Sequence, residues 1–467
     1  MTKSQVGMVG LGVMGRNMVL NIADHGFTVS GYDKDPKQQS TLSDMHYEKV
    51  TVCSTVADFV DSLESPRKIL LLVPAGKIVD YVLNDLSPLL SKDDIVVDCG
   101  NSYFVDTDRR YNDLQSKGIH FMGMGVSGGE EGARRGPSMM PGGNPYAWNA
   151  LKDILESVSA HVNGSPCVGY IGNGAAGHFT KMVHNGIEYA MMQAICEVYD
   201  VLKKCGGHTN QELSGFFKQC DAGRLKGYLI EITGEIFIKK DPDTSNDLVD
   251  MILDKAGQLG TGMWTSQTAM TLGVPLNIID AAVTMRNISG LKNERMALAS
   301  SYESHPLDMS QMKADLESSC ESALYLTFLL AYVQGLVLLM NASEKNKYEI
   351  NIHQVLNVWK GGCIIRSHLL HVMDPMFTND NASSHPLMHP SVLKTIQDSR
   401  IQLQKIVQIA AQSNIPSMVL NAADQYLTAM TTGILPMNLL QGQRDYFGAH
   451  TYERIDKPGI FHTQWES

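Results

Sequence analysis

The chain carries little positive charge. Its 467 residues include 38 Lys and Arg against 49 Asp and Glu, which gives a formal net charge of −11. This balance argues against a protein that binds nucleic acid irrespective of sequence. A site for an anionic substrate must therefore gather the few available cations in one place. Hydrophobic residues make up 43% of the chain and charged residues 19%, an ordinary globular composition. The length predicts about two to four domains.

Paired cysteines and a signal peptide are also missing. The eight cysteines form no C-x-x-C pair, and none is paired with a histidine at the spacing of a zinc site. This excludes a disulfide scaffold or a zinc ribbon. The first five residues lead into a strand-like segment and lack the organisation of a signal peptide. The most apolar stretch, residues 323–340, contains Thr327, Gln334 and Gly335, which favours a buried core helix over a membrane span. We therefore expect a cytoplasmic protein.

Strand-like and helix-like segments alternate in the N-terminal part of the chain. Short apolar runs typical of buried parallel strands lie at residues 6–9, 29–32, 69–73, 95–99 and 120–124. Segments of helix length lie between them, at residues 15–25, 79–90 and 106–117. This alternation predicts an α/β fold over residues 1–176, a doubly wound Rossmann-type sheet with helices on both faces.

Convincing strand patterns are absent after a glycine-rich stretch at residues 172–177. From residue 177 to 434 nearly every long segment has the 3.6-residue period, which predicts a large all-helical domain. The remaining residues, 435–467, form a tail that is rich in aromatic residues and too short for a domain. We expect this tail to pack against its own helical domain or to reach a second subunit.

A glycine-rich motif, Gly10-Leu11-Gly12-Val13-Met14-Gly15, follows the first predicted strand and opens a helix. Its glycines permit a tight turn and a close approach to a pyrophosphate, and the helix N-terminus offers free N–H groups to the phosphates. Asp33 ends the second predicted strand, where a carboxylate binds the ribose hydroxyls and repels the 2′-phosphate of NADP. Lys34 follows it and partly offsets that repulsion. The motif predicts a dinucleotide site that prefers NAD, with NADP as the alternative.

The segment Gly125-Val126-Ser127-Gly128-Gly129 matches the G-x-S-x-G pattern of a nucleophile elbow. Such an elbow needs an acid and a histidine in chain order on an α/β sheet, whereas the predicted sheet ends soon after this segment. Glycines also continue to residue 143. We therefore favour a loop of backbone donors that holds an anionic ligand over a serine hydrolase.

Four polar side chains fall within an otherwise apolar helix pattern at residues 181–188. These side chains are Lys181, His184, Asn185 and Glu188. At helical spacing, all four share one face of the helix. Taken alone, a solvated polar face explains such a stripe. Its position just past the domain boundary, where a Rossmann cofactor presents its nicotinamide, favours catalysis. A desolvated lysine can serve as a base near neutral pH, and a buried glutamate can serve as an acid.

Six segments together resemble the 6-phosphogluconate dehydrogenase family of the β-hydroxyacid dehydrogenase superfamily. They are GLGVMG from residue 10, DCGNS from 98, VSGGEEGARRGPSMMPGG from 126, GHFTKMVHNGIEY from 177, WKGGCIIRS from 359 and QRDYFGAHTYER from 443. The resemblance implies oxidative decarboxylation of 6-phosphogluconate to ribulose 5-phosphate and CO2, a step of the pentose phosphate pathway. It also implies NAD or NADP as cofactor, no metal ion, and a homodimer with a shared active site.

The resemblance further implies a role for each matching residue. Lys181 would take the proton of the C3 hydroxyl, and Glu188 would protonate C1 after the loss of CO2. Asn101 would lie near the nicotinamide, with Val73 and Ala75 in a turn beside the cofactor. The carboxylate and hydroxyls of the substrate would contact Ser127, Gly128, Gly129, His184 and Asn185. The substrate phosphate would meet Tyr189, Thr261, Arg286 and, from the tail of the other subunit, Arg444 and His450.

Two segments depart from the family pattern. Leu259 and Met263 stand where the family carries lysines. A lost charge-assisted contact at Leu259 costs ~1.5–3 kcal/mol, or roughly 10- to 150-fold in phosphate affinity. This departure motivates an alternative, a related β-hydroxyacid dehydrogenase that acts on a different sugar acid. NADP-using members carry Asn-Arg-Thr where this chain has Asp33-Lys34-Asp35, which again favours NAD. A third hypothesis is a homologue that binds the cofactor without catalysis, and the intact Lys181 stripe argues against it.

Overall fold

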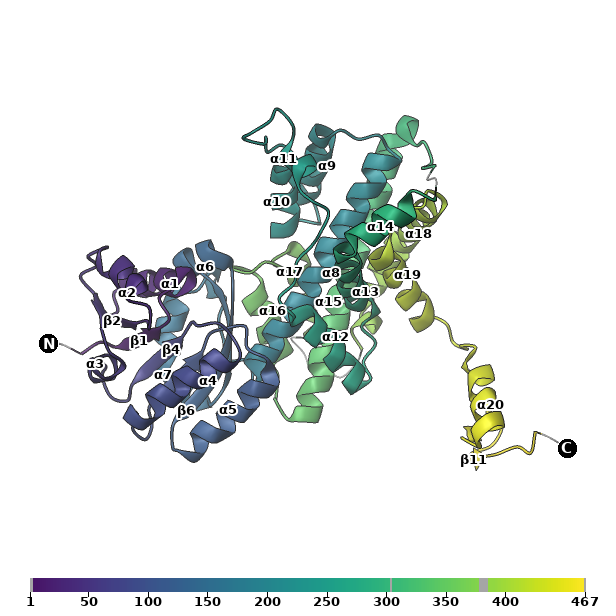
Figure 1. The fold of residues 1–467 in the computed structure, drawn as a ribbon. Helices are drawn as coiled ribbons and strands as arrows, with labels where there is room; N and C mark the ends of the chain where they lie inside the picture. The colour runs from purple at the N-terminus through teal and green to yellow at the C-terminus, as the bar shows by residue number, and fades with distance from the viewer. Residues whose placement is uncertain (1–2, 303–304, 378–384, 466–467) are drawn as a thin grey trace.

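The computed structural model describes residues 3–302, 305–377 and 385–465. Figure 1 shows a sheet with flanking helices at the N-terminal end, a larger body of helices beside it, and a C-terminal segment that extends away from both. The predicted architecture, a Rossmann-type domain followed by a large all-α domain and a tail, is thereby confirmed.

The N-terminal domain is built on a seven-stranded sheet with the order β3-β2-β1-β4-β5-β6-β7. Only the last strand of this sheet runs antiparallel to its neighbour. The strand order reverses between β1 and β4, and ligands of such sheets bind in the crevice at the carboxyl ends of the strands there. The strands are β1 (Val6–Val9), β2 (Val29–Tyr32), β3 (Val50–Val52), β4 (Lys68–Leu71), β5 (Ile95–Asp98), β6 (His120–Ser127) and β7 (Ser138–Gly143).

Each face of the sheet buries its own apolar core. In β1, Met8 points into a core that it shares with α1 (Val13–Asp24) and α7 (Pro145–Val158). Val9, the next residue, points into the opposite core, which includes α4 (Lys77–Leu86) and α5 (Phe104–Ser116). Because both faces are covered, the strands are apolar throughout, and this explains why short apolar runs predict them. Three shorter helices complete the domain, α2 (Pro36–Ser43), α3 (Val56–Asp61) and α6 (Gly129–Arg135).

The loop predicted around residues 125–129 and the glycines that follow it to residue 143 have regular structure in most places. The segment forms the end of β6, the helix α6 and the antiparallel strand β7. Its glycines serve close packing, because a Cβ on Gly142 would lie 2.2 Å from the backbone nitrogen of Gly177. A Cβ on Gly177 would in turn lie 2.2 Å from the carbonyl oxygen of Gly123. The glycines therefore bring the next helix of the chain directly onto the sheet.

Two long helices form the centre of the second domain, α8 (Ala176–Lys204) and α15 (Lys313–Asn346). By length and hydropathy the segment Ser310–Asn346 could cross a membrane, but 89% of its most apolar window is buried inside the protein. The prediction of a buried core helix at residues 323–340 is confirmed. The surrounding helices are α9 (Asn210–Ala222), α10 (Tyr228–Ile236), α11 (Leu248–Met251), α12 (Thr261–Leu272), α13 (Asn277–Gly290), α14 (Lys292–Ala299), α16 (Ile352–Trp359), α17 (His368–Met373), α18 (Pro390–Gln412) and α19 (Met418–Met430).

The tail has a small structure of its own. It comprises α20 (Met437–Gly448) and a short hairpin of β10 (Tyr452–Glu453) and β11 (Ile460–Phe461). The buried carboxylate of Asp445 holds these pieces together, since it accepts hydrogen bonds from the His462 ring at 2.9 Å and the Trp465 indole at 2.8 Å. Figure 1 shows α20 standing apart from the helical domain, so packing against its own domain is not what this chain adopts.

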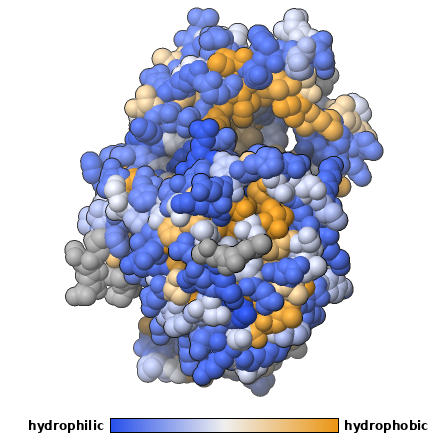
Figure 2. Space-filling view, turned by 90° about the vertical axis from the view of Figure 1, so that its left-hand side faces the viewer, coloured by the Kyte–Doolittle hydropathy of each residue, from blue (hydrophilic) through white to orange (hydrophobic). Residues whose placement is uncertain are grey.

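Apolar side chains remain exposed on the helical domain and on the tail. Figure 2 looks at the N-terminal end and shows a mainly hydrophilic surface. A large hydrophobic patch lies near the top of this view, at a height that only the helical domain reaches in Figure 1. Exposed apolar residues include Leu253, Met296 and Leu298 in the helical domain, and Phe447 and Ile455 in the tail.

Candidate active site

A cavity of about 1140 Å³ lies between the two domains, at the carboxyl ends of β1, β4, β5 and β6. We call its two sides the Rossmann wall and the helical wall. The Rossmann wall contains the predicted site residues Gly12, Val13, Met14, Gly15, Val73, Ala75, Asn101, Ser127, Gly128 and Gly129. The helical wall contains the predicted residues Lys181, Asn185, Glu188, Tyr189, Thr261 and Arg286. Segments distant in the sequence thus meet where the strand order reverses.

The glycine turn of the Rossmann wall fits a dinucleotide. Gly10 has a φ of +96°, and a Cβ there would lie 2.4 Å from the Leu72 carbonyl oxygen. A Cβ on Gly15 would lie 1.8 Å from the Gly10 carbonyl oxygen, so α1 packs tightly on the turn. A Cβ on Gly12, by contrast, would meet no atom within 4 Å and would project into free space beside the cavity. The turn therefore leaves room for a pyrophosphate at a helix N-terminus.

Asp33 lies at the end of β2 and is tied to this turn. Its Oδ2 accepts a hydrogen bond of 2.6 Å from the backbone N–H of Leu11, and its Oδ1 accepts one of 2.9 Å from the N–H of Asp35. The side chain of Lys34, by comparison, is exposed. A fixed carboxylate beside the turn is typical of the ribose-binding position in Rossmann domains.

The polar stripe on α8 is buried at Lys181 and His184 and half-buried at Asn185 and Glu188, so the interpretation as a solvated face is wrong. Lys181 is 6% exposed and His184 is 0% exposed. The Nδ1 atom of His184 lies 3.4 Å from Lys181 Nζ and 3.0 Å from Asn185 Oδ1. Its Nε2 atom lies 3.4 Å from Ser127 Oγ on the Rossmann wall. Three polar groups thus hold the imidazole behind the cavity lining.

Burial shifts the protonation equilibria of this stripe. It lowers the pKa of Lys181 to about 8, against the opposing effect of the Glu188 carboxylate. It also lowers the pKa of His184 well below its usual range, with help from the Lys181 charge, so this ring is neutral. The pKa of Glu188 is raised by burial, although Lys181 and Arg286 counteract the shift. The cavity therefore holds an amine that gives up its proton more readily than a free lysine, and a carboxyl that keeps its proton to a higher pH than a free glutamate.

The helical wall also carries groups that are suited to binding an anion. Thr261 begins α12 behind Gly260, which has a φ of +96°, and no side chain caps this helix N-terminus. The Arg286 guanidinium stacks on the Tyr189 ring at 3.4 Å and donates a hydrogen bond of 3.1 Å to the Gly257 carbonyl oxygen. Leu259, where the family carries a lysine, is 92% exposed.

The structure does not bring every predicted residue to the cavity wall. Gly10 and Leu11 lie in the turn beneath it, Asp33 and Lys34 lie at the end of β2, and His184 lies behind Lys181 and Ser127. Arg444 and His450 belong to the tail, away from the cavity of their own chain (Figure 1).

Sequence reasoning missed several lining residues, notably Trp264 and Ile364. The Trp264 ring contacts the Tyr103 ring at 4.9 Å and so joins the two domains beside the cavity. A tryptophan three residues after Thr261, at the start of the same helix, was a signal that could have indicated it.

The serine hydrolase interpretation lacks an orienting acid. Ser127 and His184 are close, but Glu188 Oε2 lies 3.9 Å from His184 Nδ1, which is too long for a hydrogen bond. Asn185 and Lys181 occupy that side of the ring instead.

A Rossmann sheet with a free glycine turn, facing a helical wall with a buried lysine and glutamate, defines a dehydrogenase that uses a nicotinamide dinucleotide. The chain matches two family models, the NAD binding domain of 6-phosphogluconate dehydrogenase over residues 5–172 and the 6-phosphogluconate dehydrogenase C-terminal domain over residues 177–465. The chain therefore belongs to the 6-phosphogluconate dehydrogenase family.

Individual relatives resemble the chain over its full length. It is 45% identical to the NADP(+)-dependent, decarboxylating 6-phosphogluconate dehydrogenase of Bacillus subtilis, with 100% of both chains covered. It is 44% identical to the decarboxylating enzyme of Escherichia coli K12, again over 100% of both. The structure of Plasmodium falciparum 6-phosphogluconate dehydrogenase, studied in its apo form, with NADP+ and with 6-phosphogluconate, matches with a TM-score of 0.96 and 40% identity. That match covers 99% of this chain and 100% of the other.

Proposed function

We propose that this protein converts 6-phosphogluconate to ribulose 5-phosphate and CO2 while a nicotinamide dinucleotide is reduced. The observation that carries the proposal is that Lys181, whose pKa is lowered by burial, and Glu188, whose pKa is raised by burial, both line the wall opposite the glycine turn. The decarboxylating relatives support the same reaction.

The nicotinamide, when bound, accepts the hydride that leaves C3 of the substrate. Lys181 accepts the proton of the C3 hydroxyl as C3 becomes a carbonyl, and its lowered pKa makes the neutral amine accessible near neutral pH. The product of this step is a β-keto acid. Its bond between the carboxyl carbon and C2 breaks, CO2 leaves, and the electron pair moves toward the C3 carbonyl oxygen.

Proton transfers complete the reaction. Lys181, now protonated, returns its proton to the oxygen on C3, which gives an enediol. Glu188 then donates a proton to the former C2, which is C1 of ribulose 5-phosphate. Lys181, neutral again, accepts the proton of the enol hydroxyl as the ketone forms. The raised pKa of Glu188 supports this role, because the carboxyl must be protonated before the step.

The other predicted residues of the site bind and orient the substrate in this proposal. The carboxylate and hydroxyls contact Ser127, Gly128, Gly129 and Asn185, and Asn101 lies beside the nicotinamide. His184, behind the lining, orients Ser127 and Lys181. Tyr189, Thr261 and Arg286 bind the phosphate, and the free N-terminus of α12 contributes partial positive charge. This terminus offsets part of the loss of a cation at Leu259.

A homodimer completes the site in this proposal. The division into residues 1–176, 177–434 and 435–467 leaves the tail free to cross to a partner, where its Arg444 adds a cation and its His450 a hydrogen-bonding ring at the phosphate end. The exposed apolar side chains of the tail and of the helical domain support such an interface, since contact between them removes apolar surface from water. A cytoplasmic location also stays a prediction.

NAD is the preferred cofactor in this proposal. The carboxylate that Asp33 holds beside the glycine turn supports this preference, because it would repel a 2′-phosphate. The Bacillus subtilis relative is named as NADP-dependent, and the proposed preference for NAD would set this chain apart from it. Initial rates with each dinucleotide test it: kcat/KM is expected to be higher with NAD, and a higher value with NADP would contradict the preference.

Substrate competition tests the reaction itself. With the preferred dinucleotide, kcat/KM for 6-phosphogluconate is expected to exceed that for gluconate by about 100-fold. Gluconate has no phosphate, so the cations of the phosphate site would lack their partner. A preference for gluconate would contradict the proposal and would favour a dehydrogenase of another sugar acid, with Leu259 and Met263 as its cause.

A further inference from the structure

Two loops border the middle of the Rossmann wall and touch one another. The first follows β4 and contributes Val73, Pro74 and Ala75 to the cavity, and the second follows β5 and contributes Gly100 and Asn101. A Cβ on Gly100 would lie only 3.2 Å from the Val73 carbonyl oxygen. The positions of the two loops are therefore linked.

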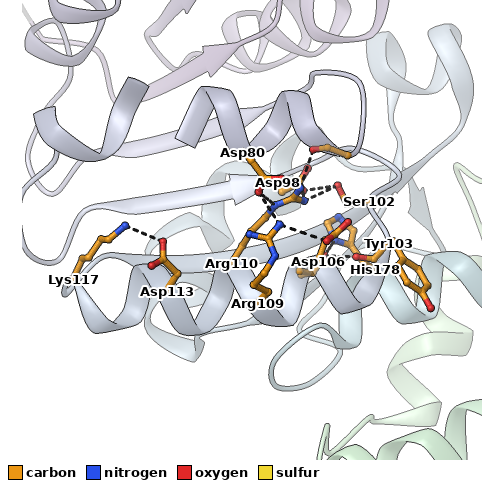
Figure 3. A network of polar contacts seen from close by, with 12 residues as sticks. Asp80, Asp98, Ser102, Tyr103, Asp106, Arg109, Arg110, Asp113, Lys117 and His178 are labelled. Atoms are coloured by element: carbon orange, nitrogen blue, oxygen red, sulfur yellow. Dashed lines mark hydrogen bonds and ion pairs between the residues drawn. The ribbon is translucent and has the colours of Figure 1, made fainter. Parts of the chain in front are cut away.

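One buried arginine lies beneath both loops (Figure 3). Arg110 belongs to α5 and is 2% exposed. Its Nε and Nη2 donate a bidentate pair of hydrogen bonds to the Asp80 carboxylate, at 2.8 and 3.1 Å. Its Nη2 also donates to the Gly76 carbonyl oxygen at 2.9 Å. Asp80 lies in the first turn of α4 and Gly76 ends the loop after β4, so these bonds fix the first loop.

The third guanidinium nitrogen faces the second loop. Arg110 Nη1 lies 3.5 Å from Asp98 Oδ2 and 3.5 Å from Ser102 Oγ. Asp98 is the last residue of β5, and its carboxylate accepts hydrogen bonds from the Gly100 N–H at 3.0 Å and the Ser102 hydroxyl at 2.6 Å. These two bonds span Asn101 and shape the turn that presents it to the cavity.

The chemistry of the guanidinium suits this double contact. Asp98 is 0% exposed, and a buried carboxylate needs a paired charge and hydrogen bonds. A guanidinium offers five donors in a rigid plane, so a single side chain can serve both loops, whereas an ammonium group cannot reproduce that fork. Arg110 itself is not part of the cavity lining.

The same helix also contacts the start of α8. Thr107 Oγ1 lies 2.7 Å from His178 Nδ1, and the Asp108 carboxylate accepts a hydrogen bond of 2.9 Å from the Ala175 N–H. Lys181 follows His178 within one helical turn. Helix α5 therefore contacts both the loops of the Rossmann wall and the helix that carries Lys181.

We propose that Arg110 is a positioning residue for the dehydrogenation, because it fixes the two loops that face the nicotinamide in alignment with Lys181. The inference rests on the proposed function for the identity of the reaction. Its structural part, the ordering of residues 72–76 and 99–103, does not depend on the substrate.

The chain offers a matched control at the opposite ends of the same two strands, β4 and β5. Arg67 precedes β4 and Asp94 precedes β5, and their side chains form an ion pair of 2.9 Å with exposures of 13% and 1%. Neither residue lines the cavity. Substitution of Arg67 thus removes a comparable buried arginine pair that lies far from the two loops.

The test compares Arg110→Lys with Arg67→Lys in the full-length protein. Both variants are expected to lower the unfolding temperature. Only Arg110→Lys is expected to speed hydrogen exchange of amides in residues 72–76 and 99–103, and to weaken binding of reduced dinucleotide, measured by its fluorescence. Its kcat is expected to fall by about 10- to 100-fold, since small misplacements of reacting groups cost that much. Arg67→Lys is expected to keep kcat and dinucleotide affinity within about twofold, as distant sites act independently.

Equal losses of kcat and affinity in the two variants, or unchanged loop exchange in Arg110→Lys, would overturn the proposal. If Arg110→Lys does not fold, Ser102→Ala takes its place, because it removes only the hydroxyl between Asp98 and Arg110. Unchanged kcat and loop exchange in Ser102→Ala would then count against it. If the wild type turns over another sugar acid, the exchange and dinucleotide measurements still test Arg110, so the two failures are distinguishable.

Discussion

The two walls of the cavity consist of different kinds of residue. Among the described residues that line it, the charged side chains all belong to the helical wall, namely Lys181, Glu188 and Arg286. The Rossmann wall consists of glycines, small polar residues and apolar residues at the ends of strands. The difference fits the proposed function, in which backbone groups of one wall would bind the dinucleotide and side chains of the other would transfer protons.

Secondary structure explains this division. Parallel strands end in turns that point backbone N–H groups toward the crevice, and glycines let a ligand approach them. A helix satisfies its own backbone groups and presents side chains in stripes instead. Because α8 lies in the core of the protein, its stripe is desolvated, and desolvation shifts the pKa values of Lys181 and Glu188 in opposite directions.

The largest expected effect is the loss of turnover in Lys181→Met. General base catalysis typically contributes about 10²- to 10⁴-fold, and kcat is expected to fall by that amount. Steady-state kinetics with 6-phosphogluconate measures it. Lys203, which lies on the same helix and pairs with Asp250 at 2.7 Å, supplies the control, since Lys203→Met is expected to leave kcat unchanged. Wild-type turnover in Lys181→Met would remove the assigned base.

A smaller gain is expected from Leu259→Lys, which restores a cation to the helical wall. The KM for 6-phosphogluconate is expected to fall by about tenfold, the lower end of the range for a charge-assisted contact, because the position is exposed. The KM for gluconate, which has no phosphate, is expected to stay constant. Leu259→Met controls for the loss of leucine. An unchanged KM for 6-phosphogluconate would mean that other cations already saturate the phosphate site.

In the Rossmann domain, Asp33→Asn is expected to change specificity without changing the fold. An asparagine can still accept the hydrogen bond from the Leu11 N–H, but the negative charge is lost. The ratio of kcat/KM for NADP to that for NAD is expected to rise about tenfold, which corresponds to ~1.4 kcal/mol of repulsion. Asp44→Asn makes the same charge change at the exposed end of α2 and serves as the control. An unchanged ratio would show that Asp33 does not discriminate the ribose substituent.

The last expected effect concerns stability and not activity. Burial of Lys181 lowers its pKa from 10.5 to about 8, which corresponds to a cost of about 3 kcal/mol when the amine is charged. The folded protein binds this proton less well than the unfolded chain, so the cost is fully present below pH 8 and is lost as the pH rises toward 10.5. Lys181→Met is therefore expected to unfold a few degrees above the wild type at pH 7. This difference in thermal unfolding is expected to shrink at higher pH, and a constant difference would contradict the shifted pKa.

Periodicity made much of the fold and of one wall predictable. Apolar runs predict β1, β2 and β5 nearly to the residue, because both faces of these strands are buried. The spacing of Lys181, His184, Asn185 and Glu188 predicts a shared helix face, but only the fold reveals that the face is buried.

Features that depend on long-range contacts were not predictable. The strand β7 was not predicted. Its glycines serve the packing of α8, a contact that local sequence does not reveal. Arg110 gave no local signal, because its partners Asp80 and Asp98 come from two other elements. The position of the tail likewise depends on packing that its composition does not specify.

One measurement tests the division between the walls most directly, the dissociation constant of reduced dinucleotide in two variants. Gly12→Val places a side chain in the free space of the Rossmann wall, and Lys181→Met removes the base from the helical wall. We expect affinity to fall by at least about tenfold in Gly12→Val, since a blocked contact to phosphate costs that much. We expect Lys181→Met to bind the dinucleotide as tightly as the wild type, although it no longer turns over. Weak dinucleotide binding in Lys181→Met together with wild-type binding in Gly12→Val would contradict the account.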